Sequence, residues 1–175
     1  MFISVTDLEL RKVQLETSFA PGLIDLEELG VAQKTPIEVR GVAELSGPLL
    51  DIRVRGHLSG SLEGSCGRCL ETVPIPAEGD FDLLYRPAET EPVADEKGIT
   101  EADADIGYYD GAGIELSDVV REQVLLWLPT HIVCREDCKG ICPMCGINRN
   151  RESCGCQPPK IDERWAALKS LQSGE

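Results

Sequence analysis

The chain has 175 residues, a formal net charge of −14 and eight cysteines, but only two histidines. Its length fits one domain, or one domain with a small appendage. Because phosphate groups repel so acidic a chain, its overall charge excludes general binding to nucleic acid and favours a basic protein partner. No apolar run is long enough for a transmembrane helix, and the first residues lack the apolar core of a secretory signal. We therefore expect a cytoplasmic protein with reduced thiols and no membrane partner.

The first part of the chain predicts a body rich in β-strands. Apolar and polar residues alternate with the period of a strand in four segments: residues 11–19, 37–45, 49–64 and 71–86. The Gly47-Pro48 step is a turn signal, and residues 20–30 (APGLIDLEELG) predict a turn and a short helix. We expect an α+β fold in which an antiparallel β-meander, or a partly open barrel, has one buried face covered by a helix.

An acidic stretch separates these strands from the predicted covering helix. Residues about 87–113 are rich in acid, glycine, proline and alanine, which favours a solvated loop and leaves open a docking site for a basic partner. Residues about 116–128 then carry apolar side chains at helical spacing, with Ser117 or Asp118 as the cap and Pro129 after the end. This helix is expected to cover the open face of the sheet.

The composition changes near residue 133. Residues 1–133 hold 10 basic and 25 acidic residues, whereas residues 134–175 hold seven and six. We therefore divide the chain into a body, residues 1–133, and a cysteine-rich segment, residues 134–175, which ends in a short predicted helix at 161–171 (IDERWAALKSL).

The cysteines are spaced as metal ligands. A disulfide framework needs an oxidising compartment, and a lone CGRC motif between two strands is weak evidence for thiol redox chemistry. Zinc instead takes four thiolate or imidazole ligands, and a short spacer lets one turn supply two of them. The chain offers four such pairs: Cys66/Cys69, Cys134/Cys138, Cys142/Cys145 and Cys154/Cys156. Together they predict two structural zinc ions, with iron–sulfur binding as the alternative.

Two groupings of these pairs are open. The spacing favours a local site from Cys142/Cys145 and Cys154/Cys156, which leaves Cys134/Cys138 to meet Cys66/Cys69 as a cross-link over more than 60 residues. In the alternative, the four cysteines from Cys134 to Cys145 form the local site, and Cys66/Cys69 join the last pair.

The residues around the cysteines predict no catalysis. His131 could replace one thiolate, while His57 lies in a predicted strand near the surface. The sequence contains no metalloprotease, deaminase, phosphate-loop or nucleophile-elbow motif, so we expect a protein that is not an enzyme and has no small-molecule substrate. Nearby basic residues are expected to offset part of the thiolate charge by donating to the sulfurs: Arg68, Arg135, Lys139, Arg149 and Arg151. Arg149 and Arg151 fit ligand recognition equally well.

Several segments resemble the YceD family. The resemblance spans roughly residues 37–171 and is carried by CGRCL, by CKGICPMCGINRN, by CGC and by DERWAAL. Members are described as large-subunit ribosomal RNA accumulation proteins. Ile141 stands where leucine is common, and INRN replaces a segment of the xNLN type.

The resemblance implies support for 23S ribosomal RNA accumulation and large-subunit assembly, and it implies no catalytic activity. Combined with the acidic body, it suggests an adaptor that holds a basic ribosomal protein or assembly factor and makes limited contact with 23S ribosomal RNA or its precursor. A zinc-dependent nucleic-acid-binding regulator and a CxxC thiol redox protein are the alternative hypotheses.

Overall fold

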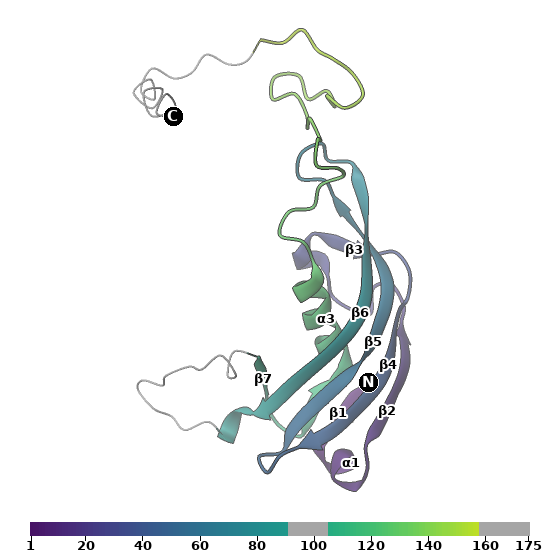
Figure 1. Cartoon of the computed structure of the whole chain (residues 1–175), viewed down its shortest axis with the longest axis vertical. Coiled ribbons are helices and arrows are strands. Elements are labelled where there is room, and N and C mark those ends of the chain that lie inside the picture. Colours follow the sequence, from purple (N-terminus) through teal and green to yellow (C-terminus); the bar gives the residue numbers. More distant parts are fainter. Residues whose placement is uncertain (91–104, 158–175) are drawn as a thin grey trace, which may run out of the picture.

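A long, curved β-sheet forms the body of the protein (Figure 1). The computed structural model describes residues 1–90 and 105–157. Neighbouring strands of the main sheet follow the order β2-β4-β5-β6-β7, and all of these pairs are antiparallel except β6 with β7. The strands are β2 (Val13–Phe19), β4 (Ile37–Ser46), β5 (Asp51–Ser65), β6 (Thr72–Pro87) and β7 (Ile106–Tyr109).

Shorter elements complete the described part of the chain. The strand β3 (Val31–Gln33) pairs with β5 beyond the region that β4 occupies. A separate two-stranded sheet joins β1 (Phe2–Ser4) to β8 (Gly113–Glu115). Single 3-10 turns form η1 (Glu27–Leu29), inside the segment predicted to be a short helix, and η2 (Ala88–Thr90).

The alternating sequence pattern predicted four strands of the main sheet correctly and missed β7. The four predicted segments correspond to β2, β4, β5 and β6, and the α+β class is confirmed. The described sheets are open, so the barrel form of the prediction is not seen. Two facing glycines help to explain the strong curvature, because Gly41 pairs with Gly56 and a Cβ on either would lie 2.8 Å from the Cα of the other.

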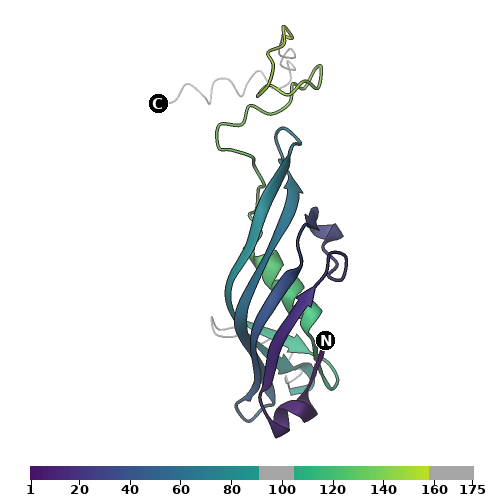
Figure 2. The same ribbon diagram turned by 90° about the vertical axis from the view of Figure 1, so that its right-hand side faces the viewer.

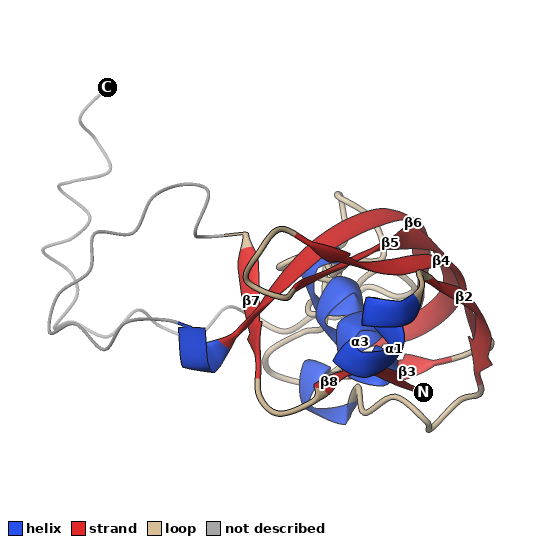
Figure 3. Cartoon of the chain, turned by 90° about the horizontal axis from the view of Figure 1, so that it is seen from below, coloured by secondary structure: helices blue, strands red, loops and turns tan. Residues whose placement is uncertain are grey.

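The helix α3 (Leu116–Trp127) packs against the concave face of the sheet (Figure 3). Leu116, Val120 and Val124 are buried as the spacing predicted. The expected caps are wrong, because Glu115 is the N-cap and makes no side-chain capping bond. Tyr85 on β6 donates a hydrogen bond of 2.5 Å to Glu122, which ties the helix to the sheet. Within the described residues, no helix is long and apolar enough to cross a membrane.

The predicted acidic loop at 87–113 is too long. Its described parts contain η2, β7 and the start of β8, while residues 91–104 lie outside the described part. Apolar and aromatic side chains fix the second half of this segment to the body. Tyr109 is buried and donates a hydrogen bond of 2.9 Å to the Leu50 carbonyl, and Ile114, which directly follows the segment, joins the core.

An N-terminal helix, α1 (Val5–Leu10), was not predicted. Ser4 caps it by accepting a hydrogen bond of 3.1 Å from the Asp7 backbone N–H, and Leu8 is buried against the body. The serine followed three residues later by an acid is a readable start signal, but six residues are too few to show a helical period.

The described part of the cysteine-rich segment, residues 134–157, lies at one end of the elongated body, beyond the turn that joins β5 to β6 (Figure 2). The described chain reaches it directly from the end of α3. The division of the chain at residue 133 remains a prediction, and the helix predicted at 161–171 lies outside the described residues.

Candidate metal centre

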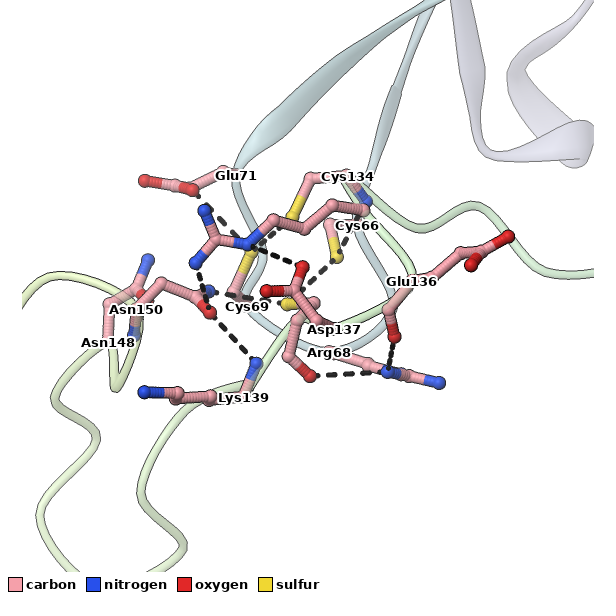
Figure 4. A network of polar contacts seen from close by, with 12 residues as sticks. Cys66, Arg68, Cys69, Glu71, Cys134, Glu136, Asp137, Lys139, Asn148 and Asn150 are labelled. Carbon is pink, nitrogen blue, oxygen red and sulfur yellow. Dashed lines mark hydrogen bonds and ion pairs between the residues drawn. The ribbon is translucent and has the colours of Figure 1, made fainter.

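Four cysteines from distant segments meet next to the β-body (Figure 4). Cys66 and Cys69 lie in the turn after β5, and Cys134 and Cys138 lie in the loop after α3. We call this group the inner tetrad. Cys66, Cys69 and Cys138 are buried, and Val73 and Val133 pack against them. The inner tetrad therefore joins the loop that follows the covering helix to the long hairpin of the sheet.

The remaining cysteines form a second group, the outer tetrad: Cys142, Cys145, Cys154 and Cys156. The sulfur atoms in each tetrad all lie within 4.8 Å of one another. Cys142 is buried, Cys154 is half-buried, and Cys145 and Cys156 are exposed. This is the grouping that the spacing favoured, and the local site from Cys134 to Cys145 does not form.

The sulfur spacing fits a tetrahedral metal. Four thiolates bound to zinc at about 2.3 Å lie about 3.8 Å apart. In the inner tetrad the Sγ atoms of Cys66 and Cys138 are 3.9 Å apart, and those of Cys69 and Cys134 are 3.6 Å apart. A disulfide requires about 2.05 Å, and all eight cysteines are free. Both tetrads therefore offer the four thiolates that a tetrathiolate metal site requires, and the sulfur spacing of the inner tetrad fits such a site.

Both tetrads contain the same turn. The Leu70 N–H donates to the Cys66 carbonyl at 2.9 Å, and the Gly146 N–H donates to the Cys142 carbonyl at 2.8 Å. Backbone N–H groups then point at the first sulfur of each turn. The N–H groups of Cys69, Arg68 and Cys134 lower the pKa of Cys66 to about 6, and those of Cys145 and Met144 lower the pKa of Cys142 to about 6.

The thiols of Cys69 and Cys156 do not ionise as readily without a cation. The Glu71 N–H lowers the pKa of Cys69, but burial and the neighbouring Cys66 outweigh it and raise the pKa to about 12. The pKa of Cys156 is raised to about 12 by the neighbouring Cys145, by burial and by Cys142. A divalent cation reverses this repulsion, because it attracts all four thiolates at once.

The expectation that basic side chains donate to the sulfurs is wrong for Arg68. Its guanidinium donates to the backbone carbonyls of Glu136 and Cys138, at 2.8 and 3.2 Å. An amide donates instead: the Asn150 Nδ2 lies 3.3 Å from the Cys138 sulfur and holds the pKa of that thiol below its ordinary value. Asn150 was not predicted from the sequence, because an asparagine in a polar loop carries no signal of its own.

The remaining predicted residues lie around the tetrads or away from them. Arg151 forms an ion pair of 2.5 Å with Glu71, while the exposed Arg149 side chain makes no ion pair within the described part of the chain. His131 is exposed and belongs to neither tetrad, so it does not replace a thiolate. His57 lies on the exposed face of β5, 2.8 Å from Asp80.

Leu70 occupies the position in its turn that Gly146 occupies in the other. It has a positive φ of 63° and its side chain is 65 % exposed, so it carries backbone strain without much packing. We expect Leu70→Gly to raise the free energy of unfolding by up to about 1 kcal/mol, measured by urea unfolding of metal-loaded protein. Leu70→Ala is the control, since it removes the side chain but keeps the strain. Equal stability of the two variants would contradict the prediction.

A second candidate site lies at the opposite end of the body, between β7, β8 and α3. It is a groove of about 370 Å³, which we call the aromatic groove. Its aromatic walls include Phe2 and Tyr108, which are 50 % and 48 % exposed. Four carboxylates also line it: Asp110, Glu115, Asp118 and Glu122. Among the described residues, no cationic side chain forms an ion pair with Asp110 or Asp118.

Comparison with known proteins gives the family. The model of the family described as large ribosomal RNA subunit accumulation protein YceD matches residues 54–172. An uncharacterized protein of Mycobacterium tuberculosis is 30% identical over 164 residues, which cover 91% of this chain and 73% of that protein. The maize protein named large ribosomal RNA subunit accumulation protein YCED homolog 1, chloroplastic, is 29% identical over 160 residues, which cover 78% of this chain and 54% of that protein.

The uncharacterized protein YlbN of Bacillus subtilis is 26% identical over 154 residues, which cover 85% of this chain and 84% of that protein. No solved structure matches the chain. The family match covers more than half of the chain and includes all eight cysteines. This chain belongs to the YceD family.

Proposed function

We propose that the protein is a non-enzymatic adaptor, stabilised by two structural zinc ions, that supports 23S ribosomal RNA accumulation during large-subunit assembly. The family description and the name of the maize relative support the ribosomal role. We place the adaptor in the cytoplasm, where large subunits would be assembled. It acts mainly through a basic protein partner, a ribosomal protein or an assembly factor, and makes limited contact with RNA.

The donor chemistry supports structural zinc. Each tetrad supplies four thiolates, which fill the tetrahedral shell that zinc prefers and leave no position for a substrate or a reactive water. A filled tetrathiolate site carries a net charge of −2, and the backbone N–H groups at Cys66 and Cys142 help to offset it. Bound zinc would act as a cross-link between segments of the chain.

The observation that carries the protein-facing role is the aromatic groove. Asp110 and Asp118, which have no ion-pair partner among the described residues, and the exposed rings fit the lysine and arginine side chains of a basic segment, through charge attraction and cation–π contact. The exposed face of the sheet is a weaker candidate for RNA. Its central arginines already pair with carboxylates, Arg53 with Asp82 at 2.6 Å and Arg55 with Glu44 at 2.9 Å.

The groove can be tested by removing charge without changing shape. In cells whose own copy of the gene is deleted, we expect the tagged wild-type protein to co-sediment with large-subunit precursors and to restore the level of 23S ribosomal RNA. Asp110→Asn together with Asp118→Asn should lower the affinity for the particle about tenfold, because two exposed contacts to cations are each worth roughly 0.5–1 kcal/mol.

The control makes the same change of charge elsewhere. Glu9→Gln together with Glu16→Gln changes two exposed carboxylates that lie outside the groove and form no ion pair with another described residue. This control variant should co-sediment with large-subunit precursors as the wild-type protein does. If the groove variant also does so, the groove is not the docking site. If the wild-type protein is found with no ribosomal protein, precursor particle or assembly factor, the adaptor role itself is wrong.

A further inference from the structure

The two tetrads are not independent, because one loop belongs to both. Residues 147–151 lie between the two ligand pairs of the outer tetrad, so a metal there would close this loop at both ends. The loop packs on the inner tetrad. The Arg149 N–H donates to the Gly140 carbonyl at 2.9 Å, and Ile141 pairs with Asn148 in an isolated antiparallel bridge.

Asn150 is the residue of this loop that reaches the inner tetrad (Figure 4). Its Nδ2 donates to the Cys138 sulfur at 3.3 Å. Its Oδ1 accepts hydrogen bonds from the Lys139 N–H at 2.8 Å and from the Arg135 Nη2 at 3.0 Å. Its own backbone N–H donates to the Asn148 Oδ1 at 2.9 Å. These contacts fix the direction of the amide, so its N–H group faces the sulfur.

A donor at this sulfur affects how tightly a metal is held. Four thiolates carry twice the charge that a divalent cation neutralises, and each N–H donor reduces the excess at one sulfur. Outer-shell donors of this kind typically change metal affinity by 10-fold to 100-fold. The inner tetrad receives this donor from a loop whose two flanking ligand pairs would be held together by a metal in the outer tetrad.

We propose that Asn150 is a positioning residue through which a metal in the outer tetrad stabilises the metal in the inner tetrad. The inference rests on the metal binding proposed above. The outer tetrad has two exposed cysteines and releases its metal first. Its loop then opens, Asn150 leaves Cys138, and release from the inner tetrad accelerates. The outer tetrad thus controls how long the inner tetrad keeps its metal, and with it the cross-link between the cysteine-rich segment and the body, when zinc becomes scarce.

The test measures zinc release from the full chain to a chromogenic chelator, after the zinc content of each variant has been determined. The wild type should hold about two zinc ions and release them in a fast outer phase and a slow inner phase. Asn150→Ala should accelerate the slow phase 10-fold to 100-fold. Asn150→Asp should accelerate it at least as much, because it keeps the shape and the acceptor but puts a carboxylate oxygen against the thiolate. Arg149→Ala, one residue away, should leave the slow inner phase unchanged.

A double-mutant cycle tests the coupling itself. Cys154→Ser, which opens the outer tetrad, should accelerate release from the inner tetrad in the wild-type background and add little in the Asn150→Ala background. Independent, multiplying effects would overturn the coupling, and a wild-type slow phase in Asn150→Asp would overturn the role of the amide donor. A wild-type chain without bound metal would remove the metal proposal and this inference together, which distinguishes that failure from the other two.

Discussion

Cys69→Ser is expected to destabilise the body far more than Cys154→Ser. Cys69 and Cys134 are 65 positions apart, and a metal that joins them closes a long loop between the sheet and the segment after α3. By the entropy of closing a loop of this size, such a cross-link is worth about 4 kcal/mol. That loss corresponds to a fall of roughly 10 °C in the unfolding midpoint.

Cys154→Ser opens only the outer tetrad, whose four ligands lie within one short stretch of chain. It should lower the midpoint by a few degrees at most and act through the coupling described above. Thermal unfolding followed by far-ultraviolet circular dichroism measures both variants, alongside wild-type protein stripped of metal by a chelator. Equal shifts for the two variants would contradict the division of the cysteines into a joining site and a local site.

The second large loss of folding stability is expected from a substitution at the centre of the sheet. Gly56→Ala places a Cβ 2.8 Å from the Gly41 Cα and against the Arg40 carbonyl oxygen, both of which are backbone atoms that no rotamer change can move away. Overpacking a well-filled site typically costs 1–3 kcal/mol, and a backbone clash lies at or above the upper end of about 3 kcal/mol.

Ser59→Ala is the matched control for this change, because Ser59 lies on the same strand and on its outer face. Its free energy of unfolding should stay within about 0.5 kcal/mol of the wild-type value. Urea unfolding of the two variants gives the comparison. A small effect of Gly56→Ala would mean that β4 and β5 can separate at this point, and that the glycine pair does not set the curvature.

Four strands of the main sheet were predictable because their signal is local. A strand with one buried face alternates apolar and polar residues, and the segments that became β4, β5 and β6 are long enough to show this period. The elements that were missed are short. β7 and β8 have four and three residues, and each is fixed by a partner distant in sequence, which no local pattern reports.

The cysteines were predictable for a similar reason. Two ligands within one turn need a short spacer, and the economical grouping of the four pairs is the one observed. The donors around the sulfurs were not predictable. Whether Arg68 or Asn150 faces Cys138 depends on how two loops stack, and the structure turns the guanidinium toward carbonyl groups and the amide toward the sulfur.

The long strand β6 is covered on its outer side by β7 only from Leu84 to Pro87, within the described part of the chain. The rest of that edge has unpaired backbone groups, to which a strand of another molecule could add. Pro74 and Pro76 lie on this stretch and pair with β5 on the other side. A proline has no backbone N–H, so the end of β6 near the cysteines lacks a hydrogen-bond donor at both Pro74 and Pro76. The protein can thus expose a long hairpin and still resist polymerisation edge to edge.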